Sequence, residues 1–298
     1  EVVALATHDA RAANEVAAGA DVEVFVVATP FYPEGGGQVG DRGTIAGPNG
    51  LVDVSDTQRV AEKLIVHRGR VREGKIAAGD AVTATVDPGH RSNTKRNHTA
   101  THLLHAALRQ VLGTHVRQAG SLVAPGHLRF DFTHTEALTP EQLAHVESLV
   151  NEKVRQDIAV HTKETSFDEA MKDGVLAFFG DKYGERVRVV EVNTVVPRFS
   201  AELCGGTHCE HTGQIGAVVI TGESSIGSGM RRLEAQTGEG AEKYTRQQAE
   251  TIAEMARMLG APVSAARGKL ASVLEERDAQ RKKIEKLERS LASGRGAD

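Results

Sequence analysis

Two short motifs place metal-binding side chains four positions apart, and they lie far from each other along the chain. The first contains His98 and His102, and the second contains Cys204 and His208. Positions i and i+4 of a helix share one face, so both imidazoles of the first motif can reach one ion. Three imidazoles and one thiolate form a tetrahedral donor set that zinc prefers. If one Zn²⁺ ion binds all four, the chain has to fold so that these distant segments meet.

The residues around these motifs leave several alternatives open. Either pair alone can be structural or incidental, but the glycines after Cys204 let the backbone approach an ion closely. His105, Cys209 and His211 are further candidate ligands, for which a place around the ligands or at the surface is the simpler interpretation. A zinc peptidase of the HExxH type needs Glu directly after the first His, where this chain has Thr99. We therefore disfavour a peptidase.

Residues 1–90 have the pattern of a β-rich domain. Short apolar runs rich in β-branched residues are separated by clusters of Gly, Asn and Asp, which is typical of strands joined by turns. The strand candidates are 22–27, 51–54, 64–66 and 81–86. This spacing predicts a small N-terminal β-barrel.

The pattern changes at Asp87-Pro88, which can cap and begin a helix that Gly113 ends. Elements of both kinds follow, so we expect an α+β domain over 91–240. Ser166 and Glu169 have the spacing of a capping box at a helix start. The other expected elements are a strand ending near 123, strands at 128–132, 187–192 and 216–221, and a helix over 140–157.

Residues 241–298 are charged and predicted to be helical, with an interruption at Gly260-Ala261-Pro262. The apolar residues from Leu270 to Leu291 fall on a/d spacing, with Arg277 and Gln280 as polar exceptions. This tail is either a coiled-coil arm that could form a homodimer or a plain surface helix. The fold class is thus α+β, with an N-terminal barrel, a zinc-binding α+β domain and a C-terminal helical tail.

Composition limits the setting in which the protein works. The two cysteines both lie in one short motif, which does not suit a disulfide scaffold and indicates a reducing, cytoplasmic compartment. We find no apolar run long enough to span a membrane and no signal-peptide pattern. Because the chain begins at Glu1, we expect it to be part of a longer protein.

The net charge of −4 does not by itself indicate a nucleic-acid partner, but the charge is unevenly distributed. Residues 91–130 contain no Asp or Glu, and they hold five of the 13 histidines together with six basic residues: Arg91, Lys95, Arg96, Arg109, Arg117 and Arg129. Such a cationic stretch suits an anionic substrate, although an ordinary basic surface would have the same composition.

Several blocks of sequence resemble the editing domain of alanyl-tRNA synthetase. The two blocks that carry the resemblance are HTATHLLHAAL at 98–108 and LCGGTH at 203–208. Four more agree in order along the chain: TPFYPEGGGQ at 29–38, QAGSLV at 118–123, FGDKYG at 179–184 and RRLEA at 231–235. Cys209, directly after His208, departs from the family pattern and leaves open which thiol binds the metal.

The resemblance implies a zinc-dependent deacylase that hydrolyses wrongly attached serine and glycine from tRNA(Ala), as part of an alanine–tRNA ligase. Its metal ligands correspond to His98, His102, Cys204 and His208, and its catalytic neighbours to Thr101 and Gln118. Its glycine-rich, substrate-binding loop corresponds to Gly35, Gly36, Gly37 and Gln38. Contacts with the acceptor end of the tRNA are assigned to Arg91, Lys95, Arg96, Arg231 and Arg232.

Other interpretations of the same residues remain. The chain could be a free-standing aminoacyl-tRNA deacylase or a non-catalytic, zinc-stabilised RNA-binding module. The glycine run could be a flexible hairpin turn, the hydroxyl of Thr101 could bond helix backbone, and Gln118 could face solvent from a strand. We see no class II aminoacylation core, and the glycine run lacks the Lys of a phosphate-binding loop.

Overall fold

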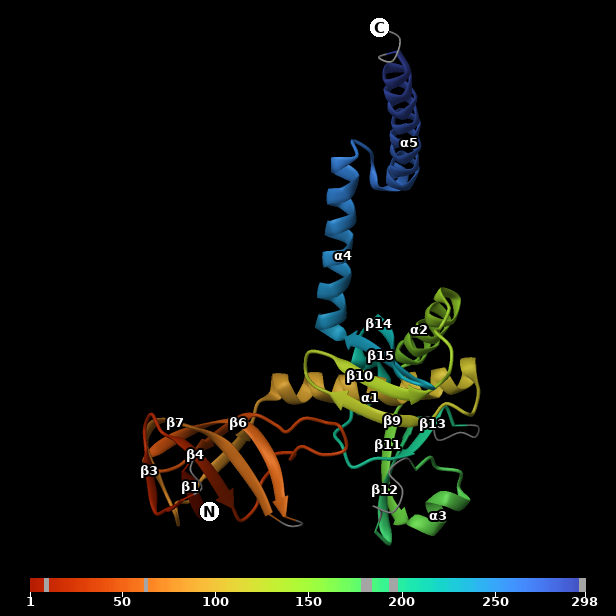
Figure 1. Cartoon of the computed structure of the whole chain (residues 1–298). Coiled ribbons are helices and arrows are strands. Elements are labelled where there is room, and N and C mark those ends of the chain that lie inside the picture. The colour runs from red at the N-terminus through yellow and green to blue at the C-terminus, as the bar shows by residue number, and fades with distance from the viewer. Residues whose placement is uncertain (8–10, 62–63, 178–183, 193–197, 295–298) are drawn as a thin grey trace. The chain divides into compact units, whose positions relative to one another are not determined.

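The computed structural model describes all residues except 8–10, 62–63, 178–183, 193–197 and 295–298. Most of the FGDKYG block therefore lies outside the described residues. The chain forms two compact units, Glu1–Glu242 and Lys243–Asp298. In the described parts the fold is a mixed α+β arrangement of several sheets and helices (Figure 1).

The N-terminal part of the first unit is an antiparallel sheet around an apolar core. Its strands are β1 Val2–Thr7, β2 Ala12–Ala13, β3 Glu15–Ala17, β4 Asp21–Val26, β5 Gly43–Ala46, β6 Gly50–Ala61, β7 Leu64–Ala77 and β8 Thr83–Val86. Alternate residues face inward, as Val22 and Val24 do from β4, because successive side chains of a strand point to opposite faces. Val24, Ile45, Val52 and Ile76 are completely buried in this core.

The expected closed barrel is not found in the described residues. The strand order is β2-β1-β4-β7-β6-β5-β8, and this path ends at β2 and β8 without closing. One edge of β7 pairs with β6, whereas the other is shared between β4 and β3. Gly74, which has a φ of +66°, lies just before the segment of β7 that pairs with β3. β3 pairs with the end of β7 beyond the segment that pairs with β4 and lies off the main strand path.

Helix α1, Pro88–Leu112, is the central element of the site. Its start and end are confirmed: the Asp87 carboxylate accepts from the backbone N–H groups of Gly89 and His90, and Gly113 ends the helix with a φ of +116°. Apolar residues of one face, Leu103, Leu104 and Leu108, are completely buried. They pack in one cluster with Phe130 and Phe132, which holds the histidine-bearing turns of α1 inside the fold.

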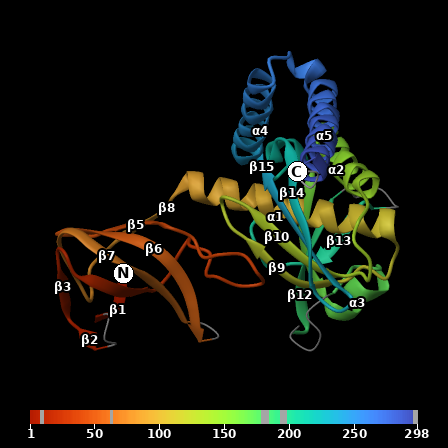
Figure 2. The same cartoon turned by 45° about the horizontal axis from the view of Figure 1, so that its top comes forward.

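Two further sheets surround α1. One has the order β14-β15-β10-β9 and contacts α1, as Figure 2 shows. The other has the order β11-β12-β13. The strands are β9 Gln118–Val123, β10 Leu128–Thr133, β11 Val160–Ser166, β12 Arg186–Val192, β13 Ser200–Leu203, β14 Val218–Gly227 and β15 Met230–Thr237. The intervening helices are α2 Pro140–Arg155, α3 Phe167–Lys172 and the short 3₁₀ helix η2 Thr212–Ile215. The capping box of Ser166 and Glu169 at the start of α3 is confirmed.

The helical tail is also confirmed. Helix α4, Gly238–Met258, is followed by α5, Val263–Gly294. Gly260 turns the chain between them with a φ of +64°. The apolar a/d residues of α5, including Leu270, Ile284 and Leu291, are exposed in the single chain. Within the described residues, no helix has the length and apolar character needed to span a membrane.

Candidate metal centre

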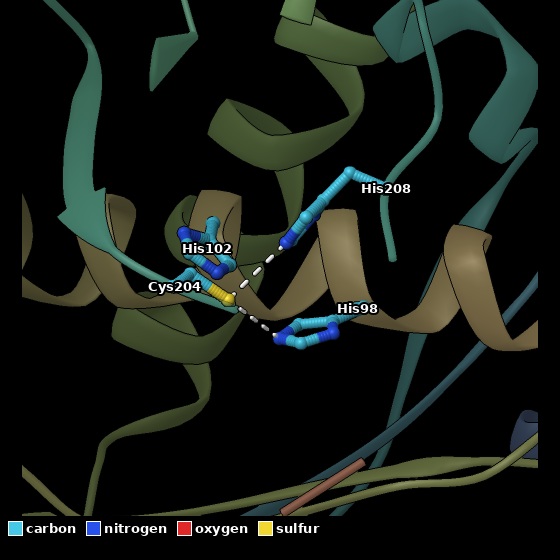
Figure 3. Close-up of side chains that lie close together, drawn as sticks. All are labelled: His98, His102, Cys204 and His208. Carbon is cyan, nitrogen blue, oxygen red and sulfur yellow. Dashed lines mark hydrogen bonds between the residues drawn. The ribbon is translucent and has the colours of Figure 1, made fainter. Parts of the chain in front are cut away.

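The two motifs meet. His98 and His102 project from neighbouring turns of α1, Cys204 follows β13, and His208 lies in the loop before η2 (Figure 3). One ligand atom from each residue lies within 4.8 Å of all the others. The Sγ atom of Cys204 is 3.4 Å from Nε2 of His98 and 3.3 Å from Nε2 of His208. The folded chain thus brings together the four residues that the spacing singled out.

This cluster fits a zinc ion by donor type and by size. Tetrahedral zinc bonds to sulfur and imidazole nitrogen place neighbouring donors about 3.3–3.6 Å apart. The distances from Cys204 to His98 and His208 already lie close to this range. The wider spacing within the set, up to 4.8 Å, requires only a modest contraction around an ion.

The electrostatic environment favours the metal-binding form of two of the ligands. Burial raises the pKa of the Cys204 thiol, but the adjacent His98 and His208 outweigh burial and hold that pKa well below its usual range. The result is a thiolate, which is the form that binds metal. Burial, with His98 nearby, lowers the pKa of His208 to about 3 and keeps its imidazole neutral.

His102 differs from His208 because it faces a carboxylate. Burial lowers the pKa of His102, but Glu202 and Cys204 outweigh burial and raise it to about 9. Because this raised pKa favours the protonated ring, a metal that binds His102 competes with a proton.

Each imidazole of the cluster has a separate polar neighbour at its outer nitrogen. Nδ1 of His98 lies 2.7 Å from Oε1 of Gln38, and Nδ1 of His208 lies 3.2 Å from Oγ1 of Thr99. Nδ1 of His102 lies 3.2 Å from Oε2 of Glu202, at ion-pair distance but without hydrogen-bond geometry. Outer contacts of this kind orient the rings, so that Nε2 is left to face the ion.

Glu202 was missed by sequence reasoning. Its side chain is buried, and its second oxygen lies 3.0 Å from Nδ1 of His105 and accepts from the hydroxyl of Ser200 at 3.3 Å. His105 thus supports the carboxylate and is not part of the cluster. The sequence shows only that a carboxylate lies two positions before the candidate ligand Cys204, which does not by itself place it against His102.

The structure distinguishes the two cysteines. Cys204 belongs to the cluster, whereas Cys209 is buried elsewhere, and its backbone N–H donates to Oγ1 of Thr99. His211, the other nearby candidate, lies 3.3 Å from the backbone oxygen of Asp157 through Nδ1. Both residues therefore lie outside the four-residue cluster.

Thr101 and Gln118, the expected catalytic neighbours, line one small cavity beside the cluster. Its volume is about 20 Å³, and its wall includes His98, His102 and Cys204. The hydroxyl of Thr101 donates to the backbone oxygen of Asn97, as one alternative anticipated. The amide nitrogen of Gln118 donates to the hydroxyl of Ser121, which lines the same cavity.

The glycine-rich loop approaches the site from the N-terminal sheet. Gly35 and Gly36 line a larger pocket of about 420 Å³ that reaches His98 and Cys204. At Gly37, with a φ of +87°, a Cβ would lie 2.3 Å from Oγ of Ser121, so no larger residue fits. Gln38 does not line this pocket and is completely buried beside His98. Substrate binding by these four residues stays a prediction.

The larger pocket contains cations that the sequence did not single out. Arg59, Arg186 and Arg188 line it together with Tyr32. Arg188 also donates to the backbone oxygens of Cys204 and Gly206, at 2.9 and 2.6 Å, and so supports the loop that carries the thiol.

The five expected RNA contacts fall into two groups. Arg91, Arg231 and Arg232 form ion pairs within the fold, with Asp41, Glu223 and Asp131 respectively. Lys95 and Arg96 line a groove of about 460 Å³ together with Arg91 and Cys209. Arg91, Lys95 and Arg96 thus come together in this groove. A role of the five residues in RNA binding stays a prediction.

Comparison with known families first defines the class of protein. A family model described as tRNA synthetases class II (A) matches residues 1–90. A second, described as threonyl and alanyl tRNA synthetase second additional domain, matches residues 187–234 and so includes Cys204 and His208. The first match points to the class II tRNA synthetases, and the second points to the additional domain of threonyl and alanyl tRNA synthetases.

Individual relatives narrow this class to one family. The chain is 47% identical to an alanine–tRNA ligase of Chloroflexus aurantiacus, over 95% of this chain and 33% of the relative. It is 45% identical to that of Rhizobium johnstonii, over 99% and 34%, and 52% identical to that of Pelotomaculum thermopropionicum, over 82% and 27%. The chain belongs to the alanyl-tRNA synthetase family. It spans about a third of the length of these relatives.

Proposed function

We propose that this chain is the editing part of an alanine–tRNA ligase, a zinc-dependent hydrolase that removes serine and glycine wrongly esterified to tRNA(Ala). The observation that carries the proposal is the cluster of His98, His102, Cys204 and His208. His98 and Cys204 line two cavities, and His102 lines the smaller of them. The match to the additional domain of threonyl and alanyl tRNA synthetases supports it. The relatives are named alanine–tRNA ligases, and this is why we propose tRNA(Ala) as the substrate carrier.

Hydrolysis of an aminoacyl ester needs a placed water and stabilisation of the oxyanion that develops. A zinc ion, when bound, supplies Lewis-acid polarisation or an anchor for the substrate's amino group. The chain's own contribution is to orient the substrate. Thr101 has donated its only hydroxyl proton to Asn97, so its oxygen can only accept a further bond from a ligand.

The small cavity suggests how serine is distinguished from alanine. A volume of about 20 Å³ has room for one water-sized group. A serine hydroxyl placed there could donate to Thr101 or to the amide oxygen of Gln118. Alanine has no such group, and it would leave the polar wall without a partner, which is unfavourable in a buried site. Glycine is smaller than both and is not excluded by size.

The acceptor end of the tRNA requires cationic contacts. The larger pocket carries Arg59, Arg186 and Arg188 near the cluster, and the separate groove carries Lys95 and Arg96. We assign the pocket to the terminal nucleotide and its ester, and the groove to backbone phosphates. Arg231 and Arg232 would contact RNA only from within their ion pairs.

The proposal is tested by incubating the purified chain with seryl-, glycyl- and alanyl-tRNA(Ala) while bound zinc is measured. We expect one zinc per chain and seryl-tRNA cleavage at least ~10-fold faster than alanyl-tRNA cleavage, about 1.4 kcal/mol of discrimination. One zinc per chain without any ester cleavage would favour a non-catalytic, zinc-stabilised RNA-binding module. Four protein ligands are typical of such structural sites.

A further inference from the structure

Gln38 connects three segments of the first unit through one atom. Its Oε1 accepts from the backbone N–H of Thr207 at 2.8 Å, and it lies 3.2 Å from the hydroxyl of Thr207 and 2.7 Å from Nδ1 of His98. The side chain comes from the glycine-rich loop between β4 and β5, His98 from α1, and Thr207 from the loop between Cys204 and His208. Gln38 is completely buried at this junction.

The contact with Thr207 determines the orientation of the amide. A backbone N–H can only donate, so the atom that faces it has to be the oxygen of Gln38 and not the nitrogen. That same oxygen then requires a proton on Nδ1 of His98, because two acceptors at 2.7 Å would repel each other. A neutral imidazole with its proton on Nδ1 has its lone pair on Nε2, the atom that faces Cys204. Gln38 thus selects the metal-binding tautomer of His98.

The loop that carries Gln38 is itself held in place. The backbone N–H of Val123 donates to the oxygen of Gly37 at 2.7 Å, and the N–H of Val39 donates to the oxygen of Val123 at 3.0 Å. Gly35 and Gln38 exchange backbone hydrogen bonds of 3.0 Å. These contacts dock the loop on β9. The distance between the Gln38 amide and His98 therefore depends on the position of the whole loop.

The other end of the amide supports a specific role for the oxygen. Nε2 of Gln38 is buried and has no hydrogen-bond partner among the described residues. A buried donor without a partner is unfavourable. The amide is therefore held through its oxygen, which has its partners in two other segments.

We infer that Gln38 is a positioning residue through which the N-terminal sheet and the metal centre stabilise each other. The inference rests on the proposed metal site. Because coupling between two sites is reciprocal, metal binding should stabilise the docked glycine-rich loop as much as the docked loop strengthens metal binding.

Two substitutions of Gln38 separate the oxygen contact from the shape of the side chain. Gln38→Met has a similar shape but no strong acceptor, and we expect its zinc affinity, measured by chelator competition, to fall 10–100-fold. Gln38→Glu keeps an acceptor at the same reach and should stay within a few-fold of the parent chain. Gln58→Met is the matched control, because Gln58 bonds Glu34 and Asp56 instead of a metal ligand. If Gln38→Met does not fold, Gln38→Asn, which is one methylene too short, replaces it.

Hydrogen exchange then tests the coupling itself. In the parent chain, zinc should slow amide exchange at residues 35–38 as well as at 204–208. In Gln38→Met at saturating zinc, only 204–208 should be protected. Unchanged zinc affinity in Gln38→Met, or no protection of 35–38 in the parent chain while 204–208 are protected, would overturn the inference. A parent chain that binds no zinc would instead remove the proposed metal site, and zinc binding without ester cleavage would leave the coupling intact.

Discussion

Oε2 of Glu202 lies 3.2 Å from Nδ1 of His102, on the side of the ring that is not needed for an ion. The carboxylate is buried and is shared with His105. With Zn²⁺ in the cluster, the thiolate of Cys204 and this carboxylate together balance the charge of the ion. A buried site without net charge avoids most of the cost of desolvating an isolated charge.

We therefore expect Glu202→Gln, which keeps the shape and removes the charge, to lower zinc affinity 10–100-fold. Chelator competition measures this change. Glu191→Gln is the control, since Glu191 is also buried but pairs with Arg198 and Lys163. Equal zinc affinities in the two variants would show that the charge of Glu202 does not act on the metal centre.

Gly206 should tolerate no side chain. A Cβ at this position would lie 2.1 Å from Cε1 of His98 and 2.8 Å from Oε1 of Gln38, whereas a Cβ at Gly205 would meet nothing within 4 Å. Gly206→Ala should displace the His98 ring and reduce bound zinc at least ~10-fold, about 1.4 kcal/mol. Gly205→Ala should bind zinc normally. Zinc content after gel filtration distinguishes the two, and normal zinc in Gly206→Ala would contradict the close packing.

The two thiols should behave differently. Cys204→Ala should lose the metal, because it removes the thiolate from the cluster. Cys209→Ala should keep one zinc per chain and lose only some stability, as expected for truncation of a small buried side chain. Bound zinc and thermal unfolding are measured for both. Loss of zinc in Cys209→Ala with full zinc in Cys204→Ala would exchange their roles.

Gln118→Leu should slow seryl-tRNA cleavage about 10-fold, because it removes the amide from the cavity proposed to take the serine hydroxyl. Glycyl-tRNA cleavage should change much less, since glycine has no hydroxyl. Single-turnover rates on both substrates give the comparison, with zinc content as the check on the fold. Equal slowing on both substrates would assign Gln118 a general role, and no slowing would remove it from the site.

The helical tail should be dispensable for ester hydrolysis. Truncation after Gly260 removes α5, whose apolar residues Leu270, Leu287 and Leu291 are exposed in the single chain. If α5 forms a homodimer, sedimentation should show a dimer for the full chain and a monomer for the truncated chain. The deacylation rate should be unchanged. A truncated chain with unchanged oligomeric state and no hydrolysis would contradict this division.

The local features of the chain followed from its sequence because they depend on short-range chemistry. Asp87, Pro88 and Gly113 define α1 by capping, by a preset φ and by a conformation that glycine favours. The four-residue spacing of His98 and His102 places both on one helical face. The four residues of the cluster were therefore predictable as candidate ligands from residue types and spacing, whereas the choice between Cys204 and Cys209 stayed open until the segments were seen to meet.

Tertiary structure decided what surrounds the ligands. Gln38 reaches His98, and Glu202 reaches His102, only because loop and strand contacts bring separate segments together. The charges of Arg91, Arg231 and Arg232 are directed into ion pairs whose partners are far away in sequence or on a neighbouring strand. The open sheet likewise depends on which strands pair along the edges of β7. Such contacts between distant residues leave no periodic trace in a single sequence, since each depends on the packing of the whole unit.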